Sequence, residues 1–500
     1  NFEEIGNRNA ILAGGSLMAL GQLLLFFSAS TFSSDLASAK GLMWLALFII
    51  IFGNGFFKPN ISSMVGSLYP KQEKSKLDSA FTIFYMGINI GAFLGQFICP
   101  YVGDVKDADG VRDIFAFKWG FLAASIAMMI GTVTFFFFKN KYVVTPEGRP
   151  IGGLPKNNTK DDFEEGESQT AKFSGQNMGI AGLLFVALFF VFRYILVNEI
   201  GFSSVGMGQL IKGLIYPFIY AAGISLAFLI MSSAENKVER QRIWVIYIVS
   251  FFIIFFWAAF EQAGSSLTFI ADNQTDRSIF GWDMPPSMVQ IFNGLFVVLL
   301  ALPFSLLWDK LRAQGKEPVS PLKQAIGLAL IALSYLIIAY NVKDLGNSGL
   351  LAIKWLILLY LIQTMGELCL SPIGLSLVGK LAPKRFASLL YGVFFISNAA
   401  GYALAGSLGA IIPATGDKFA KAEKLGINLQ DVLDKKVTLS AEQVALFEKE
   451  QIPVANTSFA GIEIHNLFEF FMVFVVLCGI ASVILAILSP RLKKMMHGVN

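Results

Sequence analysis

Residues 53–63 read GNGFFKPNISS and interrupt one of the most apolar stretches of the chain. The residues just upstream, 44–51, read WLALFIII, which is typical of a helix inside a lipid bilayer. The interruption places a lysine, Lys58, and a proline, Pro59, in the same segment. A charged side chain at membrane depth is costly, so it normally faces a protein interior or a water-filled cavity. The stretch therefore predicts a membrane protein with a polar interior.

The composition indicates the same class. Hydrophobic residues make up 55% and charged residues 15% of the chain, whereas soluble proteins carry about 25% charged residues. The net charge of +4 needs no nucleic-acid partner, because the basic residues concentrate in connections between apolar segments. Cysteines and histidines are few and scattered, so we expect no disulfide, no metal site and no enzyme active site. These residues are Cys99, Cys369, Cys478, His465 and His497.

Twelve segments are long and apolar enough to cross a bilayer core of about 30 Å as helices. Lysines and arginines gather in alternate connections, which predicts that both ends of this chain are cytoplasmic. The predicted spans are 9–31, 42–68, 79–102, 117–138, 178–198, 209–232, 243–271, 286–308, 322–341, 350–379, 386–412 and 462–489.

Two of the connections are long. Residues 139–177 are rich in glycine, proline and charge, which predicts a cytoplasmic linker between two helical bundles. Residues 413–461 lie on the opposite side of the membrane in this topology. They contain LQDVLDKK and AEQVALFEKE, which predict short amphipathic surface helices.

Four ionisable side chains lie inside predicted spans: Lys58, Arg193, Glu261 and Glu367. Arg193 is close to the end of its span, where a long side chain extends to the membrane interface. Glu261 is followed by polar residues that fit a cavity mouth or a loop equally well. Lys58 and Glu367 lie deeper and carry opposite charges. We therefore expect them to be partners across a central cavity.

Both deep charges occur on helices with weak points. A proline at membrane depth removes a backbone hydrogen bond, and the freed carbonyl must be satisfied by protein or by cavity water. Glycines lie near each proline. Broken helices of this kind supply binding groups and bending points in transporters. The predicted hinge residues are Gly53, Gly55, Pro59, Gly366 and Pro372.

Further polar side chains fit the same cavity. Asn89 is central in its span, with Tyr85 one turn before it. Asn293 lies near the outer end of its span, and Asn398 is central in FFISNAAGYALAG. The small residues around Asn89 and Asn398 suit helix packing equally well, so that alternative stays open.

These groups together suit a small zwitterion. Lys58 would bind a carboxylate, Glu367 would bind an ammonium group, and the amides and the phenol would bind polar groups between them. A poorly hydrated carboxylate is also a suitable proton carrier. The residues therefore predict a proton-coupled carrier of small zwitterions with the chemistry of short peptides.

Long motifs in the sequence resemble the proton-dependent oligopeptide transporter family. GNGFFKPNISSMVGSLY at 53–69 and DSAFTIFYMGINIGAFLG at 78–95 resemble its paired signature. GELCLSPIGLSLVGKLAP at 366–383 and FWAAFEQAGSSLTFIAD at 256–272 resemble its tenth and seventh helices. The resemblance runs over essentially the whole chain.

The resemblance implies an all-α major facilitator fold with two bundles and two extra helices between them. GNRNAILAGG at 6–15 resembles the start of the third family helix, and the chain starts at Asn1 without a methionine. We therefore expect 12 of 14 family helices, without the first two and their E-x-x-E-R-F motif. The implied domains are 1–138, a partial first bundle; 139–177, the linker; 178–235, the extra helices; and 236–500, the second bundle.

By motif, the resemblance also assigns roles to residues of this chain. It implies that Lys58, Glu261 and Glu367 couple substrate to protons, and that Asn89 and Asn293 are family binding positions. Phe394 stands where relatives often have a tryptophan before the SNA run, which affects the pocket shape. We therefore expect a substrate site formed by Lys58, Tyr85, Asn89, Asn293, Glu367, Phe394, Ser397 and Asn398.

The expected activity is proton-coupled symport of di- and tripeptides across a bacterial inner membrane, by alternating access of a monomer. No cofactor is expected besides the proton. One alternative is a carrier of the same fold for another solute, such as nitrate, a glucoside or a drug-like compound. A second is a membrane scaffold or receptor that transports nothing, although a scaffold has no use for two costly buried charges.

Overall fold

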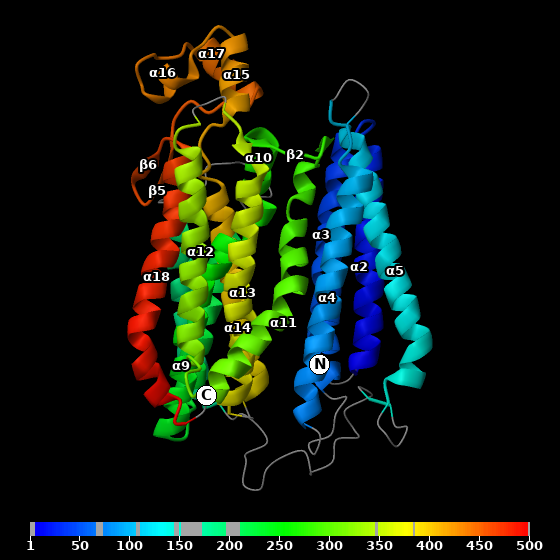
Figure 1. Cartoon of the computed structure of the whole chain (residues 1–500), viewed down its shortest axis with the longest axis vertical. Helices are drawn as coiled ribbons and strands as arrows, with labels where there is room; N and C mark the ends of the chain where they lie inside the picture. Colours follow the sequence, from blue (N-terminus) through cyan, green and yellow to red (C-terminus); the bar gives the residue numbers. More distant parts are fainter. Residues whose placement is uncertain are drawn as a thin grey trace. The chain divides into compact units, whose positions relative to one another are not determined.

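The described part of the protein consists largely of long helices (Figure 1). The computed structural model describes residues 6–66, 74–106, 111–144, 150–151, 173–196, 211–345, 349–383 and 386–498. Among them, 12 helices are long and apolar enough to cross a membrane. This confirms the predicted all-α membrane class and the predicted number of spans.

The long helices follow the predicted spans, with ends that differ by a few residues. They are α2 (Asn7–Thr31), α3 (Leu36–Gly66), α4 (Lys74–Gly103), α5 (Phe117–Tyr142), α6 (Gly175–Tyr194), α8 (Tyr216–Ser232), α9 (Lys237–Phe260), α11 (Ile291–Ala313), α12 (Ser320–Val342), α13 (Ile353–Leu381), α14 (Ala387–Gly409) and α18 (Leu467–Met495).

Short elements complete the described chain. The helical ones are η2 (Ile114–Ala116), η6 (Ile211–Ile215), η7 (Glu261–Gly264), α10 (Ser266–Asn273), η8 (Pro286–Met288), α15 (Gly416–Lys424), α16 (Leu429–Leu433) and α17 (Ala441–Lys449). The strands are β1 (Thr275–Asp276), β2 (Ser278–Ile279), β3 (Trp282–Asp283), β4 (Leu351–Ala352), β5 (Thr457–Phe459) and β6 (Ile462–Ile464). β1 pairs with β4 in parallel, and β2–β3 and β5–β6 are antiparallel hairpins.

The chain forms two compact units. Unit 1 comprises Asn1–Glu164 with Ser287–Val298, and unit 2 comprises Glu165–Pro286 with Leu299–Asn500. The first turns of α11 therefore belong to unit 1 and its remainder to unit 2.

In unit 1, helices α2 and α3 cross at a pair of glycines. A Cβ on Gly14 would lie 2.7 Å from the carbonyl oxygen of Gly53, and a Cβ on Gly53 would lie 3.0 Å from that of Gly14. Ordinary side-chain contacts lie beyond about 3.4 Å, so only glycine allows the two backbones to approach this closely.

Arg8 fixes the start of α2 to the end of α5. This buried guanidinium donates to the carbonyl oxygens of Ile151 at 2.7 Å and Lys139 at 3.0 Å, to that of Val143, and to Asn140 Oδ1 at 2.9 Å. The last carbonyls of a helix have no partner within the helix. Arg8 therefore caps α5, and the charge is satisfied without a carboxylate in this set of contacts.

Unit 2 has a crossing of the same kind between α12 and α13. A Cβ on Gly327 would lie 2.8 Å from the Gly366 carbonyl oxygen, and a Cβ on Gly366 would lie 2.9 Å from that of Gly327. On the other face of α12, the buried Tyr335 stacks on Phe474 of α18 with ring centroids 4.7 Å apart. Its hydroxyl donates to the Ala259 carbonyl of α9 at 2.7 Å. These contacts hold α9, α12, α13 and α18 together.

The segment between α14 and α18 carries helices α15, α16 and α17 with an apolar core of their own (Figure 1). Leu429, Leu433, Phe447 and Ile452 form its centre. Ser440 begins α17 with a capping box that includes Gln443. Helices α16 and α17 form where the sequence predicted amphipathic helices.

Candidate functional site

Lys58, the residue that first indicated a polar interior, lies on α3 five residues beyond the Gly53 crossing. Its side chain is exposed within the described structure. The helix continues through Pro59 to Gly66 without a break. The Gly14–Gly53 contact therefore fixes the segment that carries Lys58 against α2.

Asn89 and Asn293 occur along one seam of unit 1, where α4 packs against the start of α11. Asn89 is 8% exposed, and Phe93, one turn further along α4, lies against Gly294. A Cβ on Gly294 would be 3.4 Å from the Phe93 backbone. Asn293 is the neighbour of Gly294 and is half-buried. The structure thus brings these two predicted site residues to the same helix pair.

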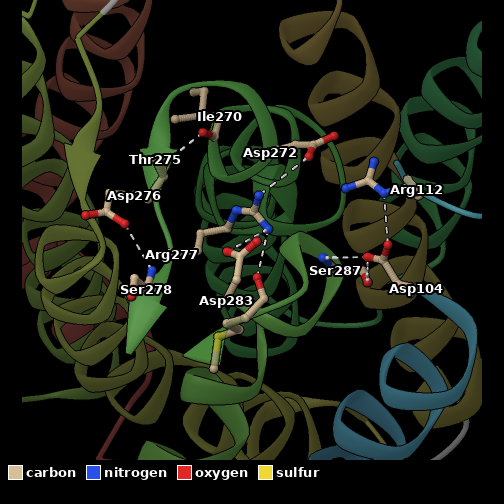
Figure 2. Close-up of polar contacts among 11 residues, drawn as sticks. Asp104, Arg112, Ile270, Asp272, Thr275, Asp276, Arg277, Ser278, Asp283 and Ser287 are labelled. Atoms are coloured by element: carbon tan, nitrogen blue, oxygen red, sulfur yellow. Dashed lines mark hydrogen bonds and ion pairs between the residues drawn. The ribbon is translucent and has the colours of Figure 1, made fainter. Parts of the chain in front are cut away.

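Asp104 holds one end of this seam (Figure 2). Its buried carboxylate accepts a hydrogen bond from Ser287 Oγ at 2.5 Å and pairs with Arg112 Nε at 3.0 Å. Ser287 lies in η8, four residues before α11 begins at Ile291, and Asp104 directly follows α4. The contact therefore fixes how far α11 can slide along α4.

Arg277 organises the connection between α10 and α11 in unit 2 (Figure 2). The guanidinium is buried and donates to the Met284 carbonyl at 2.7 Å. It also lies 4.0 Å from Asp272 and 3.9 Å from Asp283. This arginine closes the loop that carries the β2–β3 hairpin, and sequence reasoning did not single it out.

Glu367 is buried in the middle of α13. It is 9% exposed and directly follows Gly366, whose close contact with Gly327 sets the position of the helix. The helix runs unbroken to Leu381. The carboxylate is thus buried at mid-helix, and its role and its pairing with Lys58 stay predictions.

Glu261 begins the short 3-10 helix η7, where α9 ends. The next residue, Gln262, is fully buried and donates to the carbonyls of Ala258 at 2.9 Å and Ala405 at 3.0 Å. Ser266 donates to the Gln262 amide oxygen at 2.6 Å. These hydrogen bonds hold the turn against α14. Glu261 is therefore held at a fixed place, where η7 follows α9.

Residues 394–398 on α14 have three different surroundings. Phe394 is 3% exposed, and its ring would lie 2.9 Å from a Cβ on Gly374 of α13. Ser397 donates to the Val393 carbonyl of its own helix at 3.2 Å. The Asn398 amide oxygen is buried and has no hydrogen-bond partner among the residues that the structure describes. Asn398 is thus the residue of this group with unused binding capacity.

Two of the five predicted hinge residues have packing roles in the structure. Gly53 and Gly366 make the two helix crossings, and Gly55 has no atom within 4 Å of a Cβ position. Helices α3 and α13 are continuous through Pro59 and Pro372. The bending role of all five residues stays a prediction.

The remaining two residues from the sequence analysis are Tyr85 and Arg193. The side chain of Tyr85 lies outside the described part of the structure, so its predicted role is not tested. Arg193, expected at the membrane interface, is exposed and donates to the Gly213 carbonyl at 2.8 Å. Its charge therefore also joins α6 to η6, the segment before α8.

Tyr402 is a site residue that sequence reasoning missed. Its hydroxyl interacts electrostatically with the carboxylates of both Glu261 and Glu367. It follows Asn398 by four residues, so the two share a face of α14. That spacing was the available signal. Elsewhere in the described ranges, no group of three or more His, Cys, Asp and Glu side chains could hold a metal ion.

Comparisons with known proteins agree on one family. The model of the POT family matches residues 8–152 and 183–424. The peptide transporter YePEPT of Yersinia enterocolitica is 30% identical over 416 residues, which are 82% of this chain and 75% of that relative. A di-/tripeptide transporter of Lactococcus lactis is 31% identical over 420 residues, 82% of this chain and 76% of the relative.

Solved structures agree with these relatives. The crystal structure of a peptide transporter POT in complex with sulfate has a TM-score of 0.69 and 25% identity, and covers 99% of this chain and 83% of that chain. The fold is therefore the major facilitator fold of membrane transporters. Because the family model matches more than half of the residues, this multi-pass membrane chain belongs to the POT family.

Proposed function

We propose that the protein couples the uptake of di- and tripeptides to protons across a bacterial inner membrane by alternating access. The observation that carries the proposal is Glu367, a carboxylate that is 9% exposed at mid-helix in a POT-family chain. Relatives of similar sequence are named peptide and di-/tripeptide transporters. An acid at that depth is costly unless it binds a substrate or carries a proton.

The substrate groups follow from the side chains. Lys58 binds the carboxylate of the peptide, and Glu367 binds its amino group or a proton. The amides of Asn89, Asn293 and Asn398 bind the peptide backbone; the buried, unpartnered amide oxygen of Asn398 supports this role. Tyr85, Phe394 and Ser397 complete the proposed pocket. Because these groups recognise the ends and the backbone, varied peptide side chains are accepted.

Organisation and topology follow from the same proposal. Residues 1–138 belong to the first bundle, 139–177 form the linker, 178–235 are the extra helices and 236–500 form the second bundle. Both ends face the cytoplasm because basic residues gather in alternate connections. We propose a monomer that needs no cofactor besides the proton.

Uptake into proteoliposomes tests this function. The purified protein is reconstituted with an alkaline interior, and accumulation of labelled dialanine and trialanine is compared with alanine, nitrate and an alkyl glucoside. We expect both peptides to accumulate, and a protonophore to abolish accumulation. Accumulation of nitrate or the glucoside without peptides would identify the other carrier class. No movement of any solute would favour a scaffold.

A further inference from the structure

Helices α9, α13 and α14 meet at one point in unit 2. A Cβ on Gly374 of α13 would touch the Phe394 ring of α14 at 2.9 Å and Ile253 Cδ1 of α9 at 3.4 Å. From this contact, α9 and α14 run toward the same end of unit 2. Helix α13 runs in the opposite direction, from that end toward the contact. The three-way contact therefore gives a common reference level for all three helices.

Three polar residues lie at one height above that level. Glu367 is seven residues from Gly374, Glu261 is eight from Ile253, and Tyr402 is eight from Phe394. At a rise of about 1.5 Å per residue, each lies about 10–12 Å from the contact. Seven residues are about 20° short of two turns and eight residues are about 80° past them, so each residue lies within about a quarter turn of the helix face that makes the contact.

Close packing fixes Tyr402 in this layer. A Cβ on the preceding Gly401 would lie 2.7 Å from Trp257 Cβ and 3.0 Å from the Ile254 carbonyl oxygen. The Trp257 and Tyr402 rings meet edge to face, with centroids 5.8 Å apart. One turn further along, Gln262 binds the Ala405 carbonyl. Tyr402 is thus held between a contact of α14 with α9 and one with η7, and Glu261 is the residue before Gln262 of the second contact.

We infer that Tyr402 is a positioning residue of the proton-coupling site, whose hydroxyl links Glu261 on η7 to Glu367 on α13 and sets which carboxylate holds the proton. This inference rests on the proposed function. A phenol hydroxyl both donates and accepts, so it can donate to whichever carboxylate is ionised. When a proton passes through it, the phenol oxygen accepts the proton of one carboxylic acid and gives its own to the other carboxylate. Tyr402 itself is left unchanged.

Other titratable groups on the neighbouring elements have different partners. Tyr335 of α12 donates to the Ala259 carbonyl, and Tyr220 of α8 donates to the Ala400 carbonyl of α14 at 3.4 Å. Tyr216 of α8 lies against Gly406, and Tyr360 is buried on α13. Tyr402 differs from these tyrosines in that it interacts with both Glu261 and Glu367. Lys58, the predicted partner of Glu367, belongs to unit 1.

The test compares the pH dependence of transport between two hydroxyl deletions. Tyr402→Phe keeps the ring against Trp257 and removes the oxygen, and Tyr220→Phe is the matched control, because it removes a hydroxyl that also contacts α14. Peptide counterflow, which needs no net proton movement, should stay within about twofold in both variants. For Tyr402→Phe, the pH midpoint of proton-driven uptake should move by about one unit, the effect of one hydrogen bond to a charged group.

A second comparison asks whether the residue acts through the carboxylates. In a Glu261→Gln background, Tyr402→Phe should cause a much smaller pH shift, because one of the two linked acids is gone. Equal pH profiles for wild type, Tyr402→Phe and Tyr220→Phe would overturn the inference. So would a changed KM for peptide with an unchanged profile, since that would make Tyr402 a substrate contact.

Failure of the proposed function and failure of the inference give different results. If wild type neither binds nor moves peptide, the proposed function fails, whereas a normal wild type with a silent Tyr402→Phe removes only the inference. If Tyr402→Phe does not purify as folded protein, difluorotyrosine at 402 preserves the shape and acidifies the hydroxyl. An unchanged pH profile with difluorotyrosine would then overturn the inference.

Discussion

In unit 1 the crossing of α2 with α3 brings Gly14 to Gly53, and in unit 2 the crossing of α12 with α13 brings Gly327 to Gly366. In both pairs, each glycine would place a Cβ within 2.7 to 3.0 Å of the other carbonyl oxygen. Each pair also precedes a charged residue. Two regions far apart in the sequence thus use one packing device to position one ionisable side chain each.

The two charges differ in how much their own unit covers them. Lys58 is exposed, whereas Glu367 is 9% exposed. In the apolar 18-residue window of each helix, 17% of the residues are buried on α3 and 59% on α13. The close crossing therefore does not by itself bury a charge. Burial of Glu367 depends on the further packing of α13 against α9, α12 and α14.

The helices that begin these crossings are also anchored differently. Arg8, six residues before Gly14, donates to backbone carbonyls. Lys323, four residues before Gly327, pairs with Glu317 at 2.6 Å and lies over the Trp308 ring at 4.6 Å. Carbonyl acceptors do not titrate and a carboxylate does. Among the contacts of the described residues, the anchor in unit 2 therefore includes a partner whose charge depends on pH, and the carbonyl partners of Arg8 do not.

The largest expected effect is that of Glu367→Gln. The amide is the same size but cannot carry a proton, so the internal peptide concentration should rise no higher than the external one while counterflow continues. Proteoliposome uptake with and without a pH gradient measures both. Glu317→Gln, the same change in a connection outside the spans, should leave accumulation intact. Concentrative uptake by Glu367→Gln would break the proposed role of the buried charge.

Lys58→Ala should have the next largest effect. Removal of the ammonium should weaken binding of peptides with a free C-terminus by about tenfold or more, a loss of about 1.4 kcal/mol, and should leave C-terminally amidated peptides nearly unaffected. Competition binding with each peptide pair measures this. If wild type binds free and amidated peptides equally, Lys58 does not bind the carboxylate, and the two crossings position charges for different purposes.

Alanine at the glycine crossings should destabilise the fold more in unit 2 than in unit 1. Gly366→Ala pushes a methyl group against the Gly327 carbonyl at 2.9 Å in the better packed unit, and overpacking of this kind costs about 1–3 kcal/mol. Gly14→Ala should cost less, because 17% of the residues in the apolar window of α3 are buried against 59% for α13, so α3 has fewer other contacts that oppose a shift. Gly55→Ala, with no atom within 4 Å, is the matched control and should stabilise α3 by up to about 1 kcal/mol.

Thermal unfolding of the three purified variants in detergent measures this order. Equal destabilisation by Gly14→Ala and Gly366→Ala would show that packing around the two crossings is equally tight. Destabilisation by Gly55→Ala would show that the open space beside α3 is filled in the folded protein.

The spans were predictable from the sequence because a bilayer sets a minimum length of apolar helix. Their ends were less so. Helix α3 begins at Leu36 rather than near residue 42, because the Asp35 carboxylate accepts hydrogen bonds from the backbone N–H groups of Ala37 and Ser38. The first turns of that helix thus form ahead of the apolar stretch that marked the predicted span.

The partners of the site residues were not predictable in the same way. Gly53 and Gly366 were noted beside the charges, but nothing local to either residue identifies Gly14 or Gly327 as its neighbour. Tyr402 was missed for a related reason. Its place beside Glu261 depends on the register of α14 against α9, which Gly401 and Trp257 set through backbone packing. A single sequence contains the residues that make such contacts, but it does not show which residue contacts which.

The smallest expected effect is a pH dependence confined to the anchor of unit 2. Bidentate hydrogen bonds from Arg312, at 2.8 and 3.1 Å, and the Lys323 ammonium lower the pKa of Glu317 from 4.5 to about 2. A carboxyl with a lowered pKa contributes its stabilisation above its ordinary pKa. This contribution is lost as the pH falls from about 4.5 through about 2. Because the pair is near the surface, the stabilisation amounts to at most about 1 kcal/mol.

Thermal unfolding from pH 7 to pH 3, roughly the range in which carboxylates titrate, tests this contrast. Glu317→Gln should lower the melting temperature at neutral pH, and its difference from wild type should shrink as the pH falls. Arg8→Met should show a constant difference over the same range, because the carbonyl acceptors of Arg8 keep their charge distribution at every pH. If the difference for Arg8→Met shrinks as well, an acid in unit 1 contributes to its anchor, and the two helix starts are alike rather than different.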